Sequence, residues 1–365
     1  MRFIKIDLEA IAANYKTLKA LSGTAVLAIV KAEAFGHGMI EVSKKLESIG
    51  VDMLGTADLE EAMAIREAGI KSPILAWLHG QDTKFEEAIT NDIQLGASSV
   101  TTVEKIAAAA KSVGQVAKVH LKVDTGLGRN GAALSDWPGL IEKAVELKNA
   151  GAIELVGVFS HLSGTSEKDD LEQLRVFEAA IETASKLGAS FKVRHIAASQ
   201  AALLFPSTRL DMIRVGAALY GIDPSPEAVA RKHGLLPAMR VTSEVVHVKK
   251  VPSGHSVSYG YLHSTAGEST LALVPFGYTE GFPRVATGKA QVSLNGKKYT
   301  VLARVAMDQF ILDLGSDSAE VGDEVVIIGD STKGEPSAED LAKAAGTINY
   351  EIVTKMGGRA KRVFS

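Results

Sequence analysis

The sequence predicts a parallel (β/α)8 barrel of the TIM type followed by a smaller, mainly β domain. Strand-like and helix-like segments alternate through the first 225 residues or so, which is the size of such a barrel. After Leu235, β-branched runs and turn signals replace the helical patterns. The chain of 365 residues is also too long for one ordinary core. We therefore divide it into a barrel, residues 1–234, and a β-rich domain, residues 235–365.

The barrel elements follow from caps and hydrophobic periodicity. Asp7 can cap a first helix, which carries Leu8, Ile11 and Tyr15 at helical spacing on one face. The apolar run Ala25 to Val30 suits a strand buried on both faces. Further helices are predicted near 39–49, 58–69, 101–113, 134–149 and 168–187. Together with 25–31, strands are predicted near 52–56, 73–77, 93–96, 118–123, 154–160, 192–198 and 215–220.

The second domain shows mostly strand signals. Asn295-Gly296 lies between alternating segments, and this dipeptide is a strong hairpin signal. One late helix is predicted over 338–345, where Ser337 and Asp340 can form a capping box. Strands are predicted within 241–251, 271–275, 291–314 and 325–328.

The composition excludes several classes of protein. The net charge is −3 with both signs mixed, so nothing indicates binding to nucleic acid or to a membrane surface. The chain has no cysteine, which excludes disulfides, a thiolate nucleophile and a thiolate metal site. No apolar run is long enough to span a bilayer, and the N-terminal residues lack the pattern of a signal peptide. We expect a cytoplasmic enzyme without a metal.

Several predicted strands end in a residue that can do chemistry. Lys31, Lys122, His161 and Ser199 each follow or close such a strand, and the segment from Asp211 to Gly216 supplies Arg214 beside a glycine. The carboxyl ends of barrel strands meet at one mouth, where these enzymes place their active sites. Each residue alone also has a structural interpretation: Lys31 could reach solvent, His161 could be a satisfied histidine and Ser199 could be a helix cap. Their shared position favours a common site.

The second half of the chain carries tyrosines and a Met-Asp pair in several short motifs. With the barrel motifs, they resemble the alanine racemase family in order along nearly the whole chain. The segments that carry the resemblance are VKAEAFGHG around Lys31, KVDTGLGR, FSHLSGT, HIAASQAAL, DMIRVGAALYG, SVSYG, PFGYTEGFPR, RVAMDQ and TINYE.

The resemblance implies a site for pyridoxal 5'-phosphate (PLP). Lys31 would form the Schiff base, and a desolvated lysine near other cations has the lowered pKa that this requires. Arg214, braced by His161, would face the pyridine nitrogen, and Arg129 would lie near the substrate carboxylate and the phenolic oxygen. Lys122 matches a lysine that is carbamylated in many members. The phosphate would be held by Ser199, Gly216, Ala217 and Tyr350.

The resemblance further implies a homodimer with two bases in each site. Racemisation removes the Cα proton from one face and returns it to the other, which two bases achieve most directly. Lys31 would act on D-alanine, and Tyr259 from the partner subunit would act on L-alanine. Met307, Asp308 and Tyr278 would contribute to substrate binding across the same interface. The implied product is D-alanine for peptidoglycan.

The chain departs from the family pattern at five positions. Phe35 replaces a tyrosine that helps to bind the phosphate. The other departures are Glu33, Ser166, Ala198 and Ala306. These leave open a racemase of similar build that acts on serine, lysine or a broader range of substrates.

Other classes fit the sequence less well. A decarboxylase of this fold usually recruits a C-terminal cysteine, which is absent. A PLP-binding carrier protein would consist of the barrel alone, and a barrel that binds another phosphate would not need Lys31 and Tyr259 together.

Overall fold

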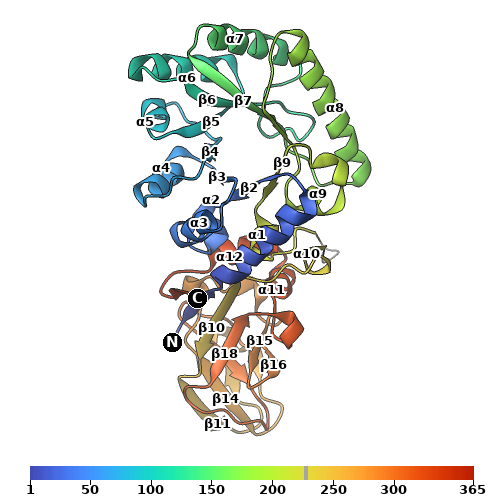
Figure 1. The fold of residues 1–365 in the computed structure, drawn as a ribbon. Helices are drawn as coiled ribbons and strands as arrows, with labels where there is room; N and C mark the ends of the chain where they lie inside the picture. The colour runs from blue at the N-terminus through green and yellow to red at the C-terminus, as the bar shows by residue number, and fades with distance from the viewer. Residues whose placement is uncertain (226–228) are drawn as a thin grey trace.

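A computed structural model describes residues 1–225 and 229–365. The chain forms two lobes, with the barrel in one and most of the later strands in the other (Figure 1). Both termini lie near the junction of the lobes (Figure 1). The main hydrophobic core runs continuously from the barrel into the second lobe.

The barrel is an eight-stranded sheet in the order β8-β7-β6-β5-β4-β3-β2-β9. All neighbouring pairs are parallel, and two backbone hydrogen bonds close the sheet between β8 and β9: Asp211 N to Arg194 O, 3.2 Å, and Arg214 N to Ala197 O, 3.0 Å. The strands are β2 (Ala25–Ile29), β3 (Met53–Thr56), β4 (Ile74–Ala76), β5 (Ile93–Ala97), β6 (Ala117–Lys122), β7 (Ile153–Phe159), β8 (Val193–His195) and β9 (Met212–Val215). The predicted fold class is therefore confirmed.

The barrel helices begin where the sequence supplies caps. Asp7, Asp58, Ser99 and Ser166 each accept a hydrogen bond from the backbone amide three residues later, as an N-cap does. The helices are α1 (Leu8–Ser22), α3 (Met39–Ser48), α4 (Leu59–Glu67), α5 (Phe85–Thr90), α6 (Val100–Val113), α7 (Trp137–Asn149), α8 (Glu167–Lys186), α9 (Ser199–Leu204) and α10 (Val229–Lys232).

Two predicted strands of the barrel need correction. The last strand is Met212–Val215, so the strand predicted at 215–220 is wrong. Ala217–Tyr220 is instead a buried 3-10 turn, η2, because Gly216 leaves the extended conformation at φ −112°, ψ −86°. A short apolar run does not by itself distinguish a strand from a buried helical turn. The strand predicted at 192–198 is only Val193–His195, and helix α5 was not predicted.

The second lobe is built from three sheets. The largest has the order β16-β15-β18-β10-β1-β19, the next has the order β11-β14-β17, and β12 and β13 form a hairpin. The strands are β1 (Phe3–Ile6), β10 (Met239–Glu244), β11 (His247–Val251), β12 (Ser256–Val257), β13 (His263–Ser264), β14 (Ser269–Val274), β15 (Gln291–Leu294), β16 (Lys297–Thr300), β17 (Phe310–Asp313), β18 (Glu324–Ile328) and β19 (Lys361–Phe364).

Two local predictions for this lobe are confirmed, and one feature was missed. Asn295 and Gly296 turn between β15 and β16 with φ of 52° and 77°, the positive values of a hairpin turn. Ser337 and Asp340 form the capping box of α11 (Ala338–Ala345), which precedes α12 (Asn349–Lys355). Strand β1 was not predicted, and it belongs to the sheet of the second lobe although residues 1–234 were assigned to the barrel.

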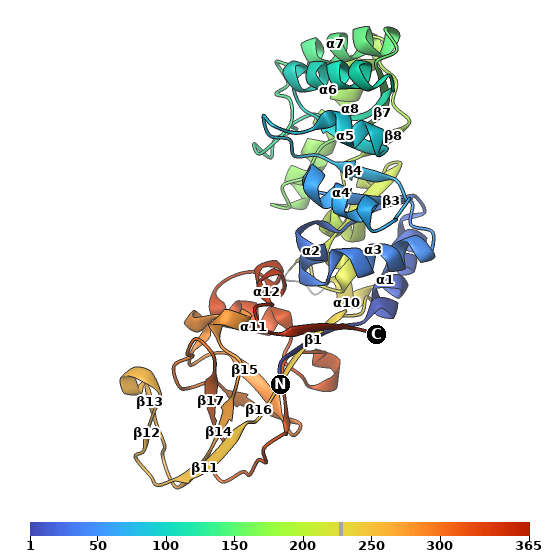
Figure 2. The same cartoon turned by 90° about the vertical axis from the view of Figure 1, so that its left-hand side faces the viewer.

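The hairpin β12–β13 carries the turn Tyr259–Tyr261. It lies at the outer edge of the second lobe, away from the barrel of its own chain (Figure 2). Ser258 and Tyr261 both have positive φ, 61° and 47°, so the turn is held in a conformation that non-glycine residues rarely adopt.

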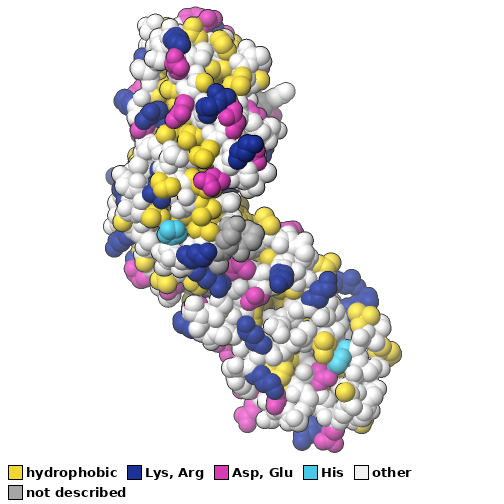
Figure 3. Space-filling view, turned by 90° about the vertical axis from the view of Figure 1, so that its right-hand side faces the viewer, with side chains coloured by type: hydrophobic (Ala, Val, Ile, Leu, Met, Phe, Trp, Pro, Cys, Tyr) yellow, Lys and Arg dark blue, Asp and Glu magenta, His cyan; other side chains and the backbone are white. Residues whose placement is uncertain are grey.

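The surface is mixed in charge. On the face shown in Figure 3, positive and negative side chains are interspersed over both lobes. Among the helices of residues 1–225 and 229–365, none combines the length and apolarity needed to cross a bilayer.

Candidate active site

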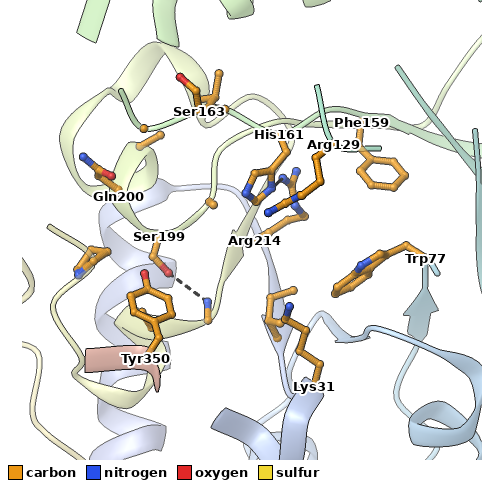
Figure 4. A pocket seen from close by; sticks show the side chains of 18 of the residues that line it. Lys31, Trp77, Arg129, Phe159, His161, Ser163, Ser199, Gln200, Arg214 and Tyr350 are labelled. Atoms are coloured by element: carbon orange, nitrogen blue, oxygen red, sulfur yellow. Dashed lines mark hydrogen bonds between the residues drawn. The ribbon is translucent and has the colours of Figure 1, made fainter. Parts of the chain in front are cut away.

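A cavity of about 390 Å³ opens at the carboxyl ends of the barrel strands. Every barrel residue assigned to the site from the sequence lines it, together with Tyr350 from α12 of the second lobe (Figure 4). These residues are Lys31, Lys122, Arg129, His161, Ser199, Arg214, Gly216, Ala217 and Tyr350. The fold thus gathers residues that are more than 300 positions apart in sequence.

Lys31 is held at the mouth by an unusual turn. It begins α2 (Lys31–Gly36), in which Ala32 to Phe35 all have left-handed backbone angles, φ 51–56°. Such a conformation costs about 1–2 kcal/mol per non-glycine residue. Glu61 accepts a hydrogen bond from Ala32 N at 2.6 Å, and Gly38 N donates to Glu33 O at 2.8 Å. Strain of this kind is concentrated at functional sites, where the surroundings impose it.

The buried side chain of His37 stabilises the same turn. Its Nδ1 lies 3.0 Å from Ala34 O and 3.0 Å from Phe35 O, so Nδ1 carries the proton and donates. The ring stacks on Tyr220 at 4.4 Å, and Tyr220 Oη donates to Ile29 O at 2.8 Å. Burial lowers the pKa of His37 to about 4, so the ring is neutral.

The cavity concentrates positive charge. Lys31, Lys122, Arg129 and Arg214 all line it. Burial, followed by the charge of Arg129, lowers the pKa of Lys31, although Glu61 acts in the opposite direction. Burial, followed by Arg214 and Arg129, lowers the pKa of Lys122 to about 8. The arrangement favours an anionic ligand and a reactive, partly neutral lysine.

Arg214 and His161 form a fixed pair. Arg214 Nη2 donates to His161 Nδ1 at 3.0 Å, to Ser160 O at 2.8 Å and to Ile196 O at 3.0 Å. Nη1 donates to His195 O at 3.0 Å. Burial and the surrounding cations lower the pKa of His161 to about 2, so this ring is neutral with its proton on Nε2.

At the opposite end of the cavity, backbone amides hold Ser199 in place. The amides of Gly216 and Ala218 donate to Ser199 Oγ, at 3.1 and 3.3 Å. Figure 4 marks one hydrogen bond to Ser199 with a dashed line. A Cβ on Gly216 would lie 2.7 Å from Cζ of Phe35, so only glycine fits there. Converging amides and a hydroxyl are typical of a phosphate site. Tyr350 lies beside Ser199 in the same view (Figure 4).

The second-lobe residues assigned to the site lie elsewhere in this chain. Tyr259 is 72% exposed and lines a separate shallow depression with Tyr261. Met307 is 54% exposed, and neither it nor Tyr278 or Asp308 lines the Lys31 cavity. Within one chain, therefore, the structure brings together the residues predicted for the cofactor and leaves out those predicted for the partner.

Several lining residues were not predicted from the sequence. Trp77 and Phe159 close one wall, and Ser163 and Gln200 close another (Figure 4). Trp77 ends the strand predicted at 73–77, so the strand-end argument that selected Lys122 could have found it. Among the described residues, no cluster of His, Asp and Glu side chains could hold a metal ion.

The fold and the cavity define a two-domain barrel enzyme with a lysine-centred site for an anionic ligand. Sequence comparison then makes the assignment specific. Residues 6–224 match the alanine racemase N-terminal domain and residues 238–364 match the alanine racemase C-terminal domain. The chain belongs to the alanine racemase family, isomerases that interconvert L-alanine and D-alanine.

Individual relatives agree along the full length. Alanine racemase of Frankia casuarinae is 43% identical over 362 residues, which covers 98% of this chain and 94% of the relative. The crystal structure of alanine racemase from Streptomyces lavendulae, which produces D-cycloserine, superposes with a TM-score of 0.97 at 43% identity, covering 100% of this chain and 97% of that one. Alanine racemase of Streptomyces coelicolor gives a TM-score of 0.97 at 40% identity, with coverage of 100% and 97%.

Proposed function

We propose that this chain racemises alanine with bound PLP, using Lys31 and the Tyr259 of a second copy as opposing bases. The observation that carries the proposal is the cavity itself, which combines a lysine of lowered pKa, further cations and a serine hydroxyl held in place by two backbone amides. PLP needs these three features for its aldehyde, its anionic groups and its phosphate.

The residues present fit PLP at both ends. Ser199 Oγ accepts from the amides of Gly216 and Ala218, so its own hydroxyl hydrogen remains available to the phosphate, beside the cavity-lining backbone of Gly216 and Ala217. At the other end, the hydrogen bonds described for Arg214 occupy Nη1 and Nη2 and leave Nε–H available to the ring nitrogen. A cation there keeps the ring nitrogen unprotonated, which favours simple proton exchange over transamination.

Each cavity residue then has a defined task. When bound, PLP withdraws electrons from the attached amino acid and so acidifies its Cα–H bond. Lys31 Nζ takes or returns the Cα proton on one face. Arg129 pairs with the substrate carboxylate, and a carbamate on Lys122 would orient Arg129 by a charge-assisted hydrogen bond. His161 accepts from Arg214 and keeps its guanidinium in place.

Proton transfer on the second face requires another chain. Tyr259 belongs to an arm that extends away from its own barrel (Figure 2). Large apolar side chains are exposed on the same lobe, as is usual for a surface that associates. They include Tyr259, Tyr261, Leu262, Tyr278, Val285, Met307 and Ile348. We propose a homodimer in which this lobe supplies Tyr259, Met307, Asp308 and Tyr278 to the partner's cavity.

The proposed setting is the cytoplasm, where the product would supply D-alanine for peptidoglycan. A panel of amino acids that includes serine and lysine measures the range of substrates on which the chain acts.

The test follows the Cα hydrogen. Purified protein with added PLP is incubated with L-alanine in deuterated water. The two enantiomers are then separated, and the deuterium content of each is measured by mass spectrometry. Two bases predict early D-alanine that carries deuterium, because the second base exchanges its proton with solvent. D-alanine that retains the substrate hydrogen would exclude the two-base mechanism, and no D-alanine would refute the activity. Lys31→Ala should abolish product, whereas Lys44→Ala, at an exposed lysine of α3, should not.

A further inference from the structure

A line of buried polar side chains crosses the barrel interior behind Arg214. Gln94 on β5, His120 on β6 and His195 on β8 are respectively 8%, 0% and 0% exposed. His120 Nε2 lies 2.7 Å from Gln94 Oε1, His120 Nδ1 lies 3.0 Å from His195 Nε2, and His195 Nδ1 lies 3.4 Å from Arg214 Nη1. Polar groups inside an otherwise apolar barrel core are costly unless every one is satisfied.

The barrel makes room for this line. His120 and His195 lie on strands that flank β7, so their rings must meet across it. They do so over Gly157 of β7, where a Cβ would lie 2.1 Å from His120 Nδ1. Phe159, also on β7, stacks on His195 at 4.9 Å with the rings nearly parallel. The contacts of the described residues thus hold both rings in one orientation.

The chemistry of arginine fixes the direction of the chain. A guanidinium only donates, so His195 Nδ1 must accept from Arg214 and His195 carries its proton on Nε2. That proton is donated to His120 Nδ1, which places the His120 proton on Nε2. Nε2–H then donates to Gln94 Oε1, the terminal acceptor. Reversing any member would set two N–H groups against each other.

We propose that Gln94, His120 and His195 form a one-directional hydrogen-bond relay that positions Arg214, and that Gln94 is its terminal acceptor. His195 accepts hydrogen bonds from Nη1 of Arg214, and His161 and two backbone carbonyls accept from Nη2. Only Nε–H is left to face the cavity. This role rests on the proposed function, in which that donor meets the ring nitrogen of PLP.

The first test needs no cofactor. The histidine ring nitrogens of the ¹⁵N-labelled full chain are observed by NMR and assigned with single His→Gln variants. The relay predicts protons on Nε2 of both His120 and His195, with neither ring titrating between about pH 6 and pH 8. A proton on Nδ1 of either ring, or titration near neutral pH, would overturn it.

The second test reverses the relay from its far end. Gln94→Glu puts a carboxylate beside His120, which favours the protonated form of His120. The Nδ1–H of His120 must then donate to Nε2 of His195. His195 would therefore carry its own proton on Nδ1, where it faces the Arg214 guanidinium. Gln94→Met keeps the size and removes the terminal acceptor without adding a charge. We expect the PLP dissociation constant to rise about tenfold or more in Gln94→Glu, with a changed absorption spectrum of bound PLP, and less in Gln94→Met. Gln115→Glu adds the same charge at an exposed position and should change neither.

The outcomes separate the two proposals. If Gln94→Glu retains the wild-type His195 signals, PLP affinity and spectrum, the relay does not position Arg214. A structural role alone would lower the thermal stability of both Gln94 variants without changing the His195 tautomer or the spectrum. If the wild-type protein shows the predicted tautomers but binds no PLP, the relay stands and the proposed function fails.

Discussion

Phe35 is the residue at which this cavity departs most clearly from the motif that it otherwise resembles. Its Cζ points toward Gly216, next to Ser199 and the converging amides. Phe35→Tyr would add a hydroxyl there, and a hydrogen bond to a charged group contributes about 1.5–3 kcal/mol. We expect the PLP dissociation constant to fall about tenfold or more, as measured by absorbance titration of the apoprotein.

A matched variant isolates this effect. Phe191→Tyr adds the same hydroxyl at a half-exposed position outside the cavity and should leave the affinity for PLP unchanged. An unchanged dissociation constant in Phe35→Tyr, with thermal stability preserved, would show that the phosphate does not lie where Ser199 and Gly216 place it.

Lys122 gives a prediction that depends on pH. Its pKa of about 8 lies below that of an ordinary lysine, so its neutral form is already substantial near pH 8. Carbon dioxide reacts only with the neutral amine, whose fraction falls about tenfold per pH unit below the pKa. With ¹³C-bicarbonate, we expect a carbamate signal by NMR near pH 8 that is lost toward pH 6. Lys122→Gln should remove the signal, and Lys118→Gln, at the ion-paired lysine on the same strand, should retain it.

At the scale of single residues, the sequence predicted which residues lie in the site better than it predicted which side chains bond to each other. Lys31, Lys122 and His161 were found because they follow apolar strands, and strand ends converge in a barrel. Gln94 and His120 were missed because a polar residue within a strand shows no partner in the sequence. The two residues pair with each other, and His195 of β8 and Arg214 of β9 continue the line, so the set forms only when the barrel brings these strands together.

At the scale of elements, the left-handed turn after β2 is the feature that could not be predicted from the local sequence. Ala32 to Phe35 contains residues that favour ordinary right-handed helix, so local propensity predicts the opposite hand. Distant groups impose the turn: Glu61 binds Ala32 N, and Arg362 Nε of β19 donates to Gly36 O at 3.1 Å. Such contacts exist only in the folded chain.

His37 provides the test of this turn. His37→Phe keeps a ring that can stack on Tyr220 but removes the donor to Ala34 O and Phe35 O. We expect a loss of about 1–3 kcal/mol in the free energy of unfolding and weaker PLP binding, because Lys31 begins this turn. Urea unfolding and absorbance titration measure the two effects. His247→Phe, at an exposed strand position, should change neither; a His37→Phe protein of unchanged stability and affinity would contradict the support role.

At the scale of the whole molecule, the second lobe contributes to the cavity of its own barrel through α12, which supplies Tyr350. Strands β1 and β19 join the two ends of the chain in one sheet beneath the barrel, so the lobes do not divide cleanly at residue 235. The sequence suggested that division because composition changes there, whereas pairing between chain ends has no local signal. The same lobe carries Tyr259 away from its own Lys31.

This separation leads to a prediction about paired subunits. Lys31→Ala and Tyr259→Phe should each abolish racemisation, because each removes one base from every site of a homodimer. A heterodimer of the two variants has one site with both bases and one site with neither, so it should show about half of the wild-type activity per dimer. The subunits are coexpressed with different tags and purified through both, and D-alanine formation is then measured by chiral chromatography.

The control is a heterodimer of Lys31→Ala with the double variant Lys31→Ala/Tyr259→Phe, in which no complete site can form and no activity is expected. An inactive heterodimer of the two single variants would show that both bases come from the same chain. That result would require the arm β12–β13 to fold back toward its own barrel. Recovered activity would instead assign the exposed tip of the arm to the partner's cavity. It would also explain why the positive φ angles of Ser258 and Tyr261 are maintained on a surface that is exposed in the single chain.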